Sequence, residues 1–515
     1  MKKRLLILAA ALLVLSACAR TAENAPLPAA APAAEADTET PPPPAPGGEI
    51  SLSMRRPATL NPVLNEDASV DKILLLVFEP LFNVGQDFSL SPALAESVET
   101  APDGLSAVVS LRAARWHDGE PVTAADFIFT VNALKAAPDG AVYKPCVQNI
   151  DGCSALSDNQ VEVRFAKNFS GNKYSFVFPL IPEHYYKGAK AGSEADMKPV
   201  GSGPYKFASF DQELSLAARE DDWRPYISAV KVIITPDLET DLYSFDQGVT
   251  DALPADMSVW GKYRGAKEAR ENPVNTTYFD FIGFNCAGAF KEAELRRAAA
   301  MCVNRLEYVN SVYLGYADLA AAPVHPASWA YSPDLPELPF DTAAAGEVFS
   351  KHAENGAKLS VRVLTNEENP ERVKIAETLK ENLGKAGAEA TIETLPFEDY
   401  KAKINSGNYD IFVGGLNLSP FPDLTFALHS SGNFFRYSDE ETDAALQDAF
   451  YALNEGELRA ALSKVQKRCA EDLPLYGLCF RKQALLLDKK IYGYNTSYIN
   501  NPYGDLKNWY IAQKQ

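Results

Sequence analysis

The sequence predicts a mixed α/β protein, and two observations support this fold class. From Gly48 onward, segments with β-strand character alternate with segments of helical periodicity, and no internal repeat is detectable. With 46% hydrophobic and 23% charged residues, the composition is that of an ordinary globular protein rather than a disordered chain or a membrane bundle. At roughly 150 residues per domain, the 515 residues suggest about three modules with a large core.

The N-terminus has the pattern of an export signal. A basic stretch, residues 2–4, precedes an apolar run, residues 5–15, that is too short to span a bilayer comfortably. The following Leu15-Ser16-Ala17-Cys18 resembles the bacterial lipobox, in which the signal is cut before a cysteine that then carries lipid. We therefore expect residues 1–17 to be a signal peptide and Cys18 to be lipidated; a plain signal peptide with an incidental cysteine is the alternative.

A spacer follows Cys18. Residues 18–48 are rich in Ala, Pro and acidic side chains, without apolar periodicity, so this segment cannot bury enough surface to fold. The proline run at 41–44 should stay extended. We expect a disordered tether that holds an exported protein, through its lipid, at the outer face of the cytoplasmic membrane, in the periplasm or on the cell surface.

The charge of the chain excludes one class of partner. Removing residues 1–17 takes away three positive charges and no acid, so the net charge falls from −19 to −22. Nothing gathers Lys and Arg into a patch, which argues against nucleic acid. The acidic balance fits a well-solvated surface, with cationic ligands as the weaker alternative.

Six cysteines remain beside Cys18, an even number that suggests disulfides in an exported protein. They are Cys146, Cys153, Cys286, Cys302, Cys469 and Cys479. We expect pairs between chain neighbours, 146–153, 286–302 and 469–479. A zinc site would need close Cys-x-x-Cys spacing, which the sequence lacks.

A strand, a turn and a helix are predicted in order over residues 107–135. Residues 107–116 resemble a strand, and 123–135 carry apolar side chains at helical spacing. Asp118-Gly119 between them is a turn dipeptide, since glycine can adopt a positive φ without steric cost.

The polar residues of this stretch could be mistaken for an active site. Thr123, followed three residues later by Asp126, has the pattern of a capping box, so Asp126 should satisfy backbone N–H groups rather than move protons. His117 and Asp118 are neighbours leaving a strand, and their side chains start in different directions. We therefore interpret these residues as architectural.

Further elements continue the alternation. The β-α-β unit near residue 370, with a Gly387 stop after its helix, is of the parallel type. The other predicted elements are a glycine turn and strand at 201–210, a strand at 278–285, an amphipathic helix at 291–313, and a buried strand at 409–415.

Several segments, in this order, resemble the extracellular solute-binding proteins of peptide- and nickel-type ABC importers, called family 5. They are LNPVLNEDASVDKILLLVFEPLF, LSPALAESVETAPDG, LRAARWHDGEPVTAADFIFT, GSGPYKF, FNCAGAFKEAELRRAAAMCVNR and YDIFVGG. The resemblance runs from about Ile50 to Trp509. No single segment would be sufficient, but their order is specific.

The resemblance implies a two-lobed, periplasmic-binding-protein-like α/β fold with a hinge and an extra inserted subdomain, enclosing a solute between the lobes. The implied parts are an N-terminal lobe of 49–92, 200–278 and 490–515, an inserted subdomain at 93–199, and a C-terminal lobe at 279–489. It also implies a monomer that delivers its solute to a permease with its ATPase.

One departure from the family pattern bears on the solute. Peptide-binding members carry Gly-Trp-x-x-Asp-x-x-Asp-Pro after the Tyr-Asp strand, and the first Asp pairs with the peptide amine. Here Leu416 stands in place of the Trp, and Ser419 in place of that Asp. A buried ammonium without a carboxylate would be costly, so a conventional peptide site requires Asp423, Glu66 or Asp67 to supply the charge.

Candidate ligand-binding residues lie in four places, and all are expectations from sequence. They are Asn65, Asp67 and Ser69, then Asn285, then Gly415, Asn417 and Ser419, and finally Arg436. Backbone groups at 414–417 could pair with an extended ligand, or the two glycines there could merely permit close packing. Phe435 and Tyr437 could stack on a ligand, or could be core residues.

No catalytic residue, metal or cofactor is expected. The histidines, at 117, 184, 325, 352 and 429, lack ligand spacing. An exported hydrolase is one alternative function, but Gly-x-Ser-x-Gly and His-Glu-x-x-His are absent from the sequence. A surface receptor or adhesion protein that uses the fold without transport is another. The favoured function is capture of a peptide or small polar solute for an ABC importer.

Overall fold

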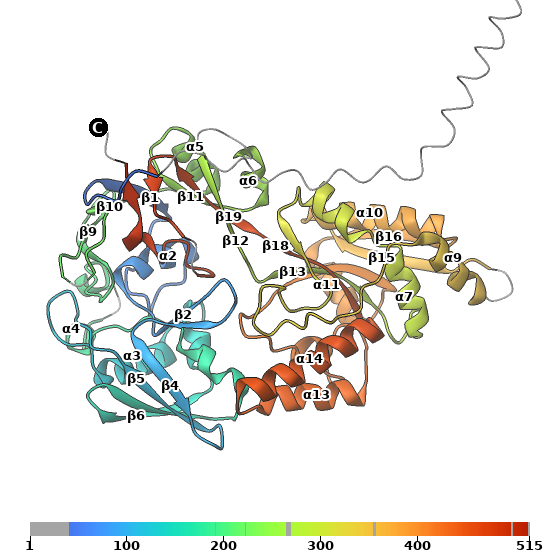
Figure 1. Cartoon of the computed structure of the whole chain (residues 1–515), viewed down its shortest axis with the longest axis horizontal. Helices are drawn as coiled ribbons and strands as arrows, with labels where there is room; N and C mark the ends of the chain where they lie inside the picture. Colours follow the sequence, from blue (N-terminus) through green and yellow to red (C-terminus); the bar gives the residue numbers. More distant parts are fainter. Residues whose placement is uncertain are drawn as a thin grey trace, which may run out of the picture. The chain divides into compact units, whose positions relative to one another are not determined.

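Helices pack against β-sheets in two lobes joined by paired strands (Figure 1). The computed structural model describes residues 41–515, except 191, 222, 264–268, 354–356, 496–497 and 513–515. The predicted signal peptide, Cys18 and most of the predicted tether therefore lie outside the described residues. In the described part, no helix combines the length and hydropathy needed to cross a bilayer.

The last residues of the predicted tether are held by the fold. The Tyr510 hydroxyl donates to the Pro42 carbonyl at 2.8 Å, and the Gly47 amide donates to the Tyr226 carbonyl at 2.7 Å. The packed part of the chain thus begins before the expected boundary at residue 48.

A four-stranded sheet of order β1-β10-β9-β8 carries the N-terminal lobe. Its strands are β1 Glu49–Met54, β10 Ala229–Ile234, β9 Leu214–Ala218 and β8 Tyr205–Phe210. β1 pairs with β10 in parallel, and alternation along β1 places Ile50, Leu52 and Met54 in the core. Helix α2, Ala68–Val77, contacts β1 and β8.

The segment between these strands forms a second four-stranded sheet, of order β4-β5-β7-β6. Its strands are β4 Ala95–Thr100, β5 Ser106–Leu111, β7 Gln160–Phe165 and β6 Ile150–Ser157, and α3 Ala124–Ala136 contacts it. β5 ends at Leu111 rather than at Trp116 as predicted. The reason is the following turn, in which the Trp116 amide donates to the Glu120 carbonyl at 2.8 Å.

The C-terminal lobe is built on a six-stranded sheet of order β14-β18-β13-β17-β15-β16. Its strands are β14 Ala317–Leu319, β18 Leu475–Arg481, β13 Tyr278–Phe284, β17 Ile411–Asn417, β15 Ser360–Asn366 and β16 Glu389–Leu395. β15 and β16 are parallel and joined by α10, Pro370–Lys385, which confirms the predicted β-α-β unit. The predicted strands at 278–285 and 409–415 are also present.

The predicted helix at 291–313 is not continuous. α7, Ala293–Met301, ends near Cys302, and a separate turn, α8 Arg305–Glu307, follows and leads into a π-helical segment, Tyr308–Val312. The Asn304 side chain accepts a hydrogen bond from the Glu307 amide at 3.1 Å. This cap starts the second helix separately, so apolar periodicity alone overestimated the length.

Two neighbouring strands pass from one lobe to the other. β12, Ala269–Val274, leads into β13, and β18 leads into β19, Gln483–Asp488. β12 pairs with β19 in a three-stranded sheet with β11, Ala252–Ala255, while β13 pairs with β18 in the six-stranded sheet. The crossing residues 275–277 and 482 form the hinge region. β19, expected within the C-terminal lobe, thus pairs with strands from segments assigned to the N-terminal one.

The predicted disulfides are absent: the six cysteines from Cys146 to Cys479 are all free. For two of the predicted pairs the cause is the sheet. Cys302 and Cys479 belong to the apolar cluster on one face of the six-stranded sheet, whereas Cys286 and Cys469 pack with the cluster on the other face. Neighbours in the chain are therefore separated by the sheet.

Candidate functional site

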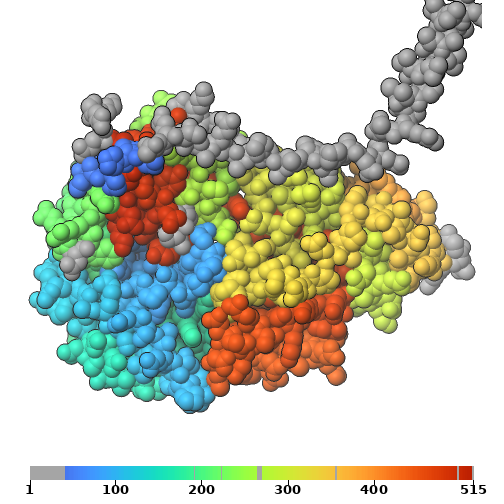
Figure 2. All heavy atoms as spheres, viewed as in Figure 1, coloured from blue at the N-terminus to red at the C-terminus, as the bar shows by residue number. Residues whose placement is uncertain are grey.

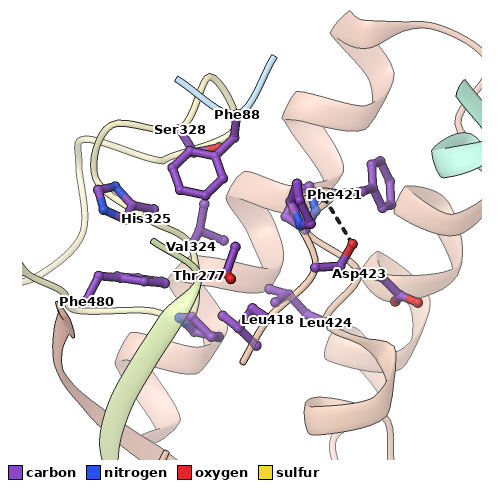
Figure 3. Close-up of a pocket in the computed structure, with 14 residues that line it drawn as sticks. Phe88, Thr277, Val324, His325, Ser328, Leu418, Phe421, Asp423, Leu424 and Phe480 are labelled. Atoms are coloured by element: carbon purple, nitrogen blue, oxygen red, sulfur yellow. Dashed lines mark hydrogen bonds between the residues drawn. The ribbon is translucent and has the colours of Figure 1, made fainter. Parts of the chain in front are cut away.

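A small pocket lies where the hinge region meets both lobes (Figure 3). Its walls come from Phe88 in the N-terminal lobe, Thr277 in the hinge region, and the loops 323–328 and 418–424 of the C-terminal lobe. We call it the hinge pocket. Its volume is about 20 Å³, room for about one water molecule.

His325 is buried in the wall of the hinge pocket. Its ring lies between Phe88 and Phe480, with centroid distances of 4.9 and 4.7 Å. Nδ1 accepts from the Ala327 amide at 3.0 Å, so the neutral ring carries its proton on Nε2, which has no hydrogen-bond partner among the described residues. Burial lowers the pKa of His325 to about 4, and Asp318 opposes this shift only in part.

Ser419 also lines the hinge pocket, and its side chain accepts a long hydrogen bond from the backbone. Its Oγ accepts from the Phe421 amide at 3.2 Å. Asp423 lines the same pocket, and one of its oxygens accepts from the Thr425 amide at 2.9 Å. A carboxylate therefore does stand near Ser419, four residues along the same loop.

The other two carboxylates considered for this charge lie at the start of α2. Asp67 is the N-cap of α2, and its Oδ1 accepts from the amides of Ser69 and Val70 at 2.7 and 3.1 Å. Burial favours the protonated acid, but these bonds and nearby Arg55 outweigh it and lower the pKa of Asp67. Glu66 is exposed beside Gly140. Neither residue lines the hinge pocket.

A second, larger pocket adjoins the first and shares Phe421 with it. Its volume is about 260 Å³. We call it the aromatic pocket. Its lining residues are Ser89, Leu90, Ser170, Lys173, Tyr174, Trp329, Phe421, Ala452, Leu453, Asn454, Glu455 and Leu458. Both lobes contribute to it.

Hydrogen bonds across the lobes hold the aromatic walls. Trp329 Nε1 donates to the Tyr174 hydroxyl at 3.0 Å, and that hydroxyl donates to the Phe88 carbonyl at 2.6 Å. The Trp329 amide also donates to the Asp87 carbonyl at 3.0 Å. In Figure 2 the orange atoms of the C-terminal lobe lie directly against the blue atoms of the N-terminal part.

A buried ion cluster lies beside the hinge region. Asp280, 1% exposed, accepts from Arg372 Nη2 at 3.0 Å and from the Tyr313 hydroxyl at 2.8 Å. Arg481 Nε lies 3.0 Å from Asp280 Oδ2, the oxygen that also accepts from Tyr313. Tyr313 and Arg481 also line a third pocket, of about 270 Å³, which Asp256 to Ser258 close from the N-terminal lobe. One carboxylate thus faces two guanidinium groups, while Asp256 and Glu371 line the same pocket as Arg481.

The sequence-predicted site residues are only partly brought together. Ser419 lines the hinge pocket, and the Asn417 side chain accepts from the Thr277 hydroxyl at 2.6 Å in the hinge region. Gly415 lies opposite Asp280 in β13. A Cβ at position 415 would be 2.0 Å from Arg372 Nη2, so this glycine makes room for the ion cluster.

The remaining predicted residues are occupied by local structure. Asn65 bonds through its side chain to the backbone of Asp67, and the Ser69 hydroxyl accepts from the Arg55 amide at 2.9 Å. Asn285 donates to the carbonyls of Gly407 and Tyr409. Arg436 is exposed and donates to the Asn405 carbonyl at 2.7 Å. Their part in ligand binding stays a prediction.

Burial decides one further alternative that the sequence left open, and side-chain bonding decides another. Phe435 is 0% and Tyr437 5% exposed, and both belong to the core of the C-terminal lobe. His117 bonds to the backbone of Gly201 and Gly203, while Asp118 pairs with His184 at 2.7 Å. Over the described residues, no three His, Cys, Asp or Glu side chains group as metal ligands would.

The aromatic walls were missed by sequence reasoning. Tyr174, Trp329 and Phe421, together with Phe88 of the hinge pocket, come from segments far apart in the chain, and isolated aromatic residues outside long helices and strands give no periodic signal. Trp329 lies in the proline-rich stretch PVHPASWAYSP, which is the only local hint of an exposed functional loop.

Comparison with known proteins shows the family and the fold. The family described as bacterial extracellular solute-binding proteins, family 5 Middle, matches residues 89–436. The chain is 24% identical over 508 residues to the oligopeptide-binding protein AppA of Bacillus subtilis, which covers 91% of this chain and 92% of the relative. It is 25% identical over 421 residues to heme-binding protein A of Haemophilus influenzae, covering 73% of this chain and 76% of that protein.

Among solved structures, the ABC transporter substrate-binding protein CtaP of Listeria monocytogenes has the same fold. It superposes with a TM-score of 0.76 at 22% identity, covering 91% of this chain and all of that one, 100%. The two-lobed, hinged α/β fold predicted from sequence is thereby confirmed.

Proposed function

Since the chain belongs to family 5 of the bacterial extracellular solute-binding proteins, we propose that it captures a peptide or related polar solute between its lobes for an ABC importer. The observation that carries this proposal is the position of the hinge pocket and the aromatic pocket, which are walled by both lobes beside the crossing strands. A solute held there touches both lobes, so closure buries it and opening releases it.

The partners follow from the same premise. We propose a permease and its ATPase as the recipients of the solute, with the protein acting as a monomer outside the cytoplasmic membrane. Lipid on Cys18 would keep it at that membrane, and the lipobox pattern supports this part of the proposal.

For a peptide, Asp423 is the residue we assign to the free amine. It lines the pocket that holds Ser419, and its Oδ1 accepts from the Thr425 amide. A charge-assisted bond from an ammonium to this carboxylate would replace the contact that the family's Asp makes at position 419. The Ser419 hydroxyl would contribute a neutral hydrogen bond beside it.

The first test is native mass spectrometry of residues 19–515, purified from an oxidising compartment, followed by denaturing release of whatever co-purifies. Short peptides would support the proposal. A non-peptide solute would contradict the peptide assignment while leaving solute capture intact.

The amine assignment is tested by titrating trialanine and N-acetyl-trialanine into Asp423→Asn. We expect wild type to prefer the free amine by more than tenfold, as a charged hydrogen bond contributes about 1.5–3 kcal/mol. The variant should lose that preference. Asp399→Asn, an exposed acid in α11 (Phe397–Ser406), is the matched control. Equal preference in all three proteins would remove Asp423 from the site.

Hydrolysis is the contrasting activity. Mass spectrometry of the trialanine solution after incubation with the protein should return intact peptide. Cleavage products that depend on the protein would favour the exported hydrolase instead.

A further inference from the structure

We propose that the aromatic pocket is a side-chain subsite, and that the preferred solute places a large aromatic or apolar group in it. This inference rests on the proposed function and names the class of solute. It comes from the size of the pocket, the state of its polar groups and its position between the lobes.

The volumes of the two pockets indicate which of them can hold a side chain of the solute. The hinge pocket, at about 20 Å³, has no room for a side chain, whereas the aromatic pocket has about 260 Å³. The two pockets share Phe421, so the larger space lies next to the pocket that holds Ser419 and Asp423. The bulky part of the solute therefore belongs in the aromatic pocket.

Apart from Lys173, the polar side chains that line the aromatic pocket already take part in hydrogen bonds or ion pairs. Trp329 Nε1 and the Tyr174 hydroxyl bond to each other, and the Ser170 hydroxyl donates to the Ala449 carbonyl at 2.7 Å. The Asn454 side chain caps α14, Glu455–Asp472, and Glu455 pairs with Arg459 at 2.8 Å. Apart from the Lys173 ammonium, these walls offer a solute ring faces and aliphatic surface.

Apolar surface is exposed at the aromatic pocket. Leu453 is 47% exposed, and Leu90 and Trp329 are half-buried. Covering this surface with a ring gains about 25 cal/mol per Å² of apolar area, with ring contacts in addition. A methyl group would leave most of the pocket unfilled.

The charges disfavour a cationic side chain. Lys173 lines the aromatic pocket, and the acid there, Glu455, is already ion-paired with Arg459. An ammonium entering the pocket would lose water without gaining a free carboxylate. The expected order of side chains is therefore aromatic, then leucine, then alanine, with lysine last.

Because the aromatic pocket lies between the lobes, the solute side chain bound in it should affect closure of the lobes. Leu90 and residues 170–174 come from one lobe, and Trp329, Phe421 and Leu453 from the other. A ring between them contacts both lobes only when they are together, so its burial favours the closed state. Affinity should thus depend strongly on the side chain in this pocket.

The test uses calorimetric titration of residues 19–515 with tripeptides of alanine that carry one Phe, Leu or Lys at the first, second or third position. We expect a Phe peptide to bind at least tenfold tighter than trialanine, and the matching Lys peptide to bind weaker than trialanine. In Leu453→Trp, which fills the pocket, the Phe preference should fall below threefold.

Leu238→Trp, at an equally exposed leucine of α5 (Leu238–Asp246), is the control and should keep the preference. A second variant, Trp329→Ala, removes one wall and should also lose the preference. Peptides that bind wild type equally whatever their side chains would overturn this inference and leave the proposed function standing. If no peptide binds wild type, the proposed peptide function itself has failed, which is a different result.

Discussion

Gly415 occupies a place where any side chain would collide with a buried ion pair. A Cβ there would be 2.0 Å from Arg372 Nη2 and 2.2 Å from Asp280 Oδ1. Asp280 is buried, and its bonds to Arg372 and Tyr313 need this space. The glycine in β17 therefore supports the cluster rather than a ligand.

Gly415→Ala should lower the free energy of unfolding by about 2–4 kcal/mol, because separating a buried ion pair leaves charge uncompensated. Urea unfolding followed by circular dichroism measures this. Gly384→Ala in α10 is the control, since no atom lies within 4 Å of a Cβ at that position. There alanine should stabilise the helix by about 0.5–1 kcal/mol. A variant at 415 as stable as wild type would show that the pair readjusts freely.

His325 gives the fold a pH dependence with a definite sign. Its folded pKa of about 4 lies below the ordinary value of 6.5, so between these values the unfolded chain binds a proton that the folded chain does not. This contribution to stability is present above pH 6.5 and is lost as pH falls towards 4. Asp318, which faces the ring, and nearby Lys482 act on the same titration in opposite directions.

His325→Phe should remove the loss of folding stability that the wild-type protein shows at acid pH because of this residue. For wild type this loss amounts to about 3 kcal/mol at pH 4. The measurement is the free energy of unfolding of both proteins at pH 7 and pH 4. Between pH 7 and pH 4, the free energy of unfolding should fall by less in the variant than in wild type. A difference between the two proteins that stays constant with pH would mean that the pKa of His325 is the same in the folded and the unfolded protein.

At the scale of elements, α3 shows how a polar cluster can serve architecture alone. The Asp126 carboxylate accepts from the Thr123 amide at 2.8 Å, from Trp116 Nε1 at 3.2 Å and from the Glu183 amide at 2.8 Å. The predicted capping box is therefore confirmed. The same side chain also joins the turn before the helix to the segment after the sheet.

Asp126→Ala should cost about 3–4 kcal/mol of stability, because three donors lose their acceptor in a buried place. Thr123→Ala should cost about 1 kcal/mol, as for an ordinary cap. Thermal unfolding gives the order of the two variants, and the affinity for the co-purified solute should stay unchanged in both. Loss of affinity at unchanged stability would return Asp126 to the functional residues.

The elements show where sequence reasoning succeeds. The β-α-β unit and the strands at 278–284 and 411–417 were predictable, because strong local periodicity and glycine stops define them. The break at Asn304 and the early end of β5 were missed, since a local cap or turn there overrides the pattern. Two of the three predicted cysteine pairs failed because the sheet separates chain neighbours, which spacing cannot reveal.

At the scale of the whole molecule, aromatic contacts join the inserted segment to the C-terminal lobe. The Phe169 ring lies 4.8 Å from that of Phe450 and 5.2 Å from that of Phe421. These contacts connect segments more than 250 residues apart in the sequence. The candidate site depends on them, and for this reason its walls could not be read from the chain, whereas Ser419 within a single loop could.

Phe450→Ala should weaken the contact between the lobes by about 1 kcal/mol, which changes the ratio of open to closed molecules about fivefold. Small-angle X-ray scattering of the solute-free protein should show a larger radius of gyration. Phe426→Ala, at an exposed ring 44% accessible to solvent, is the control and should leave it unchanged. Identical scattering from all three proteins would show that the lobes are held together elsewhere.

The packing of residues 42–48 against residues 510–511, the two ends of the folded part, has a practical consequence. Gly48 lies so close to Ile511 that a Cβ on it would be 2.9 Å from Ile511 Cδ1, and Tyr510 bonds to Pro42. A short linker can therefore join these ends, and a circular permutant can be opened at an exposed loop instead. A fluorescent domain inserted at such a new opening in the C-terminal lobe would turn lobe movement into an optical signal.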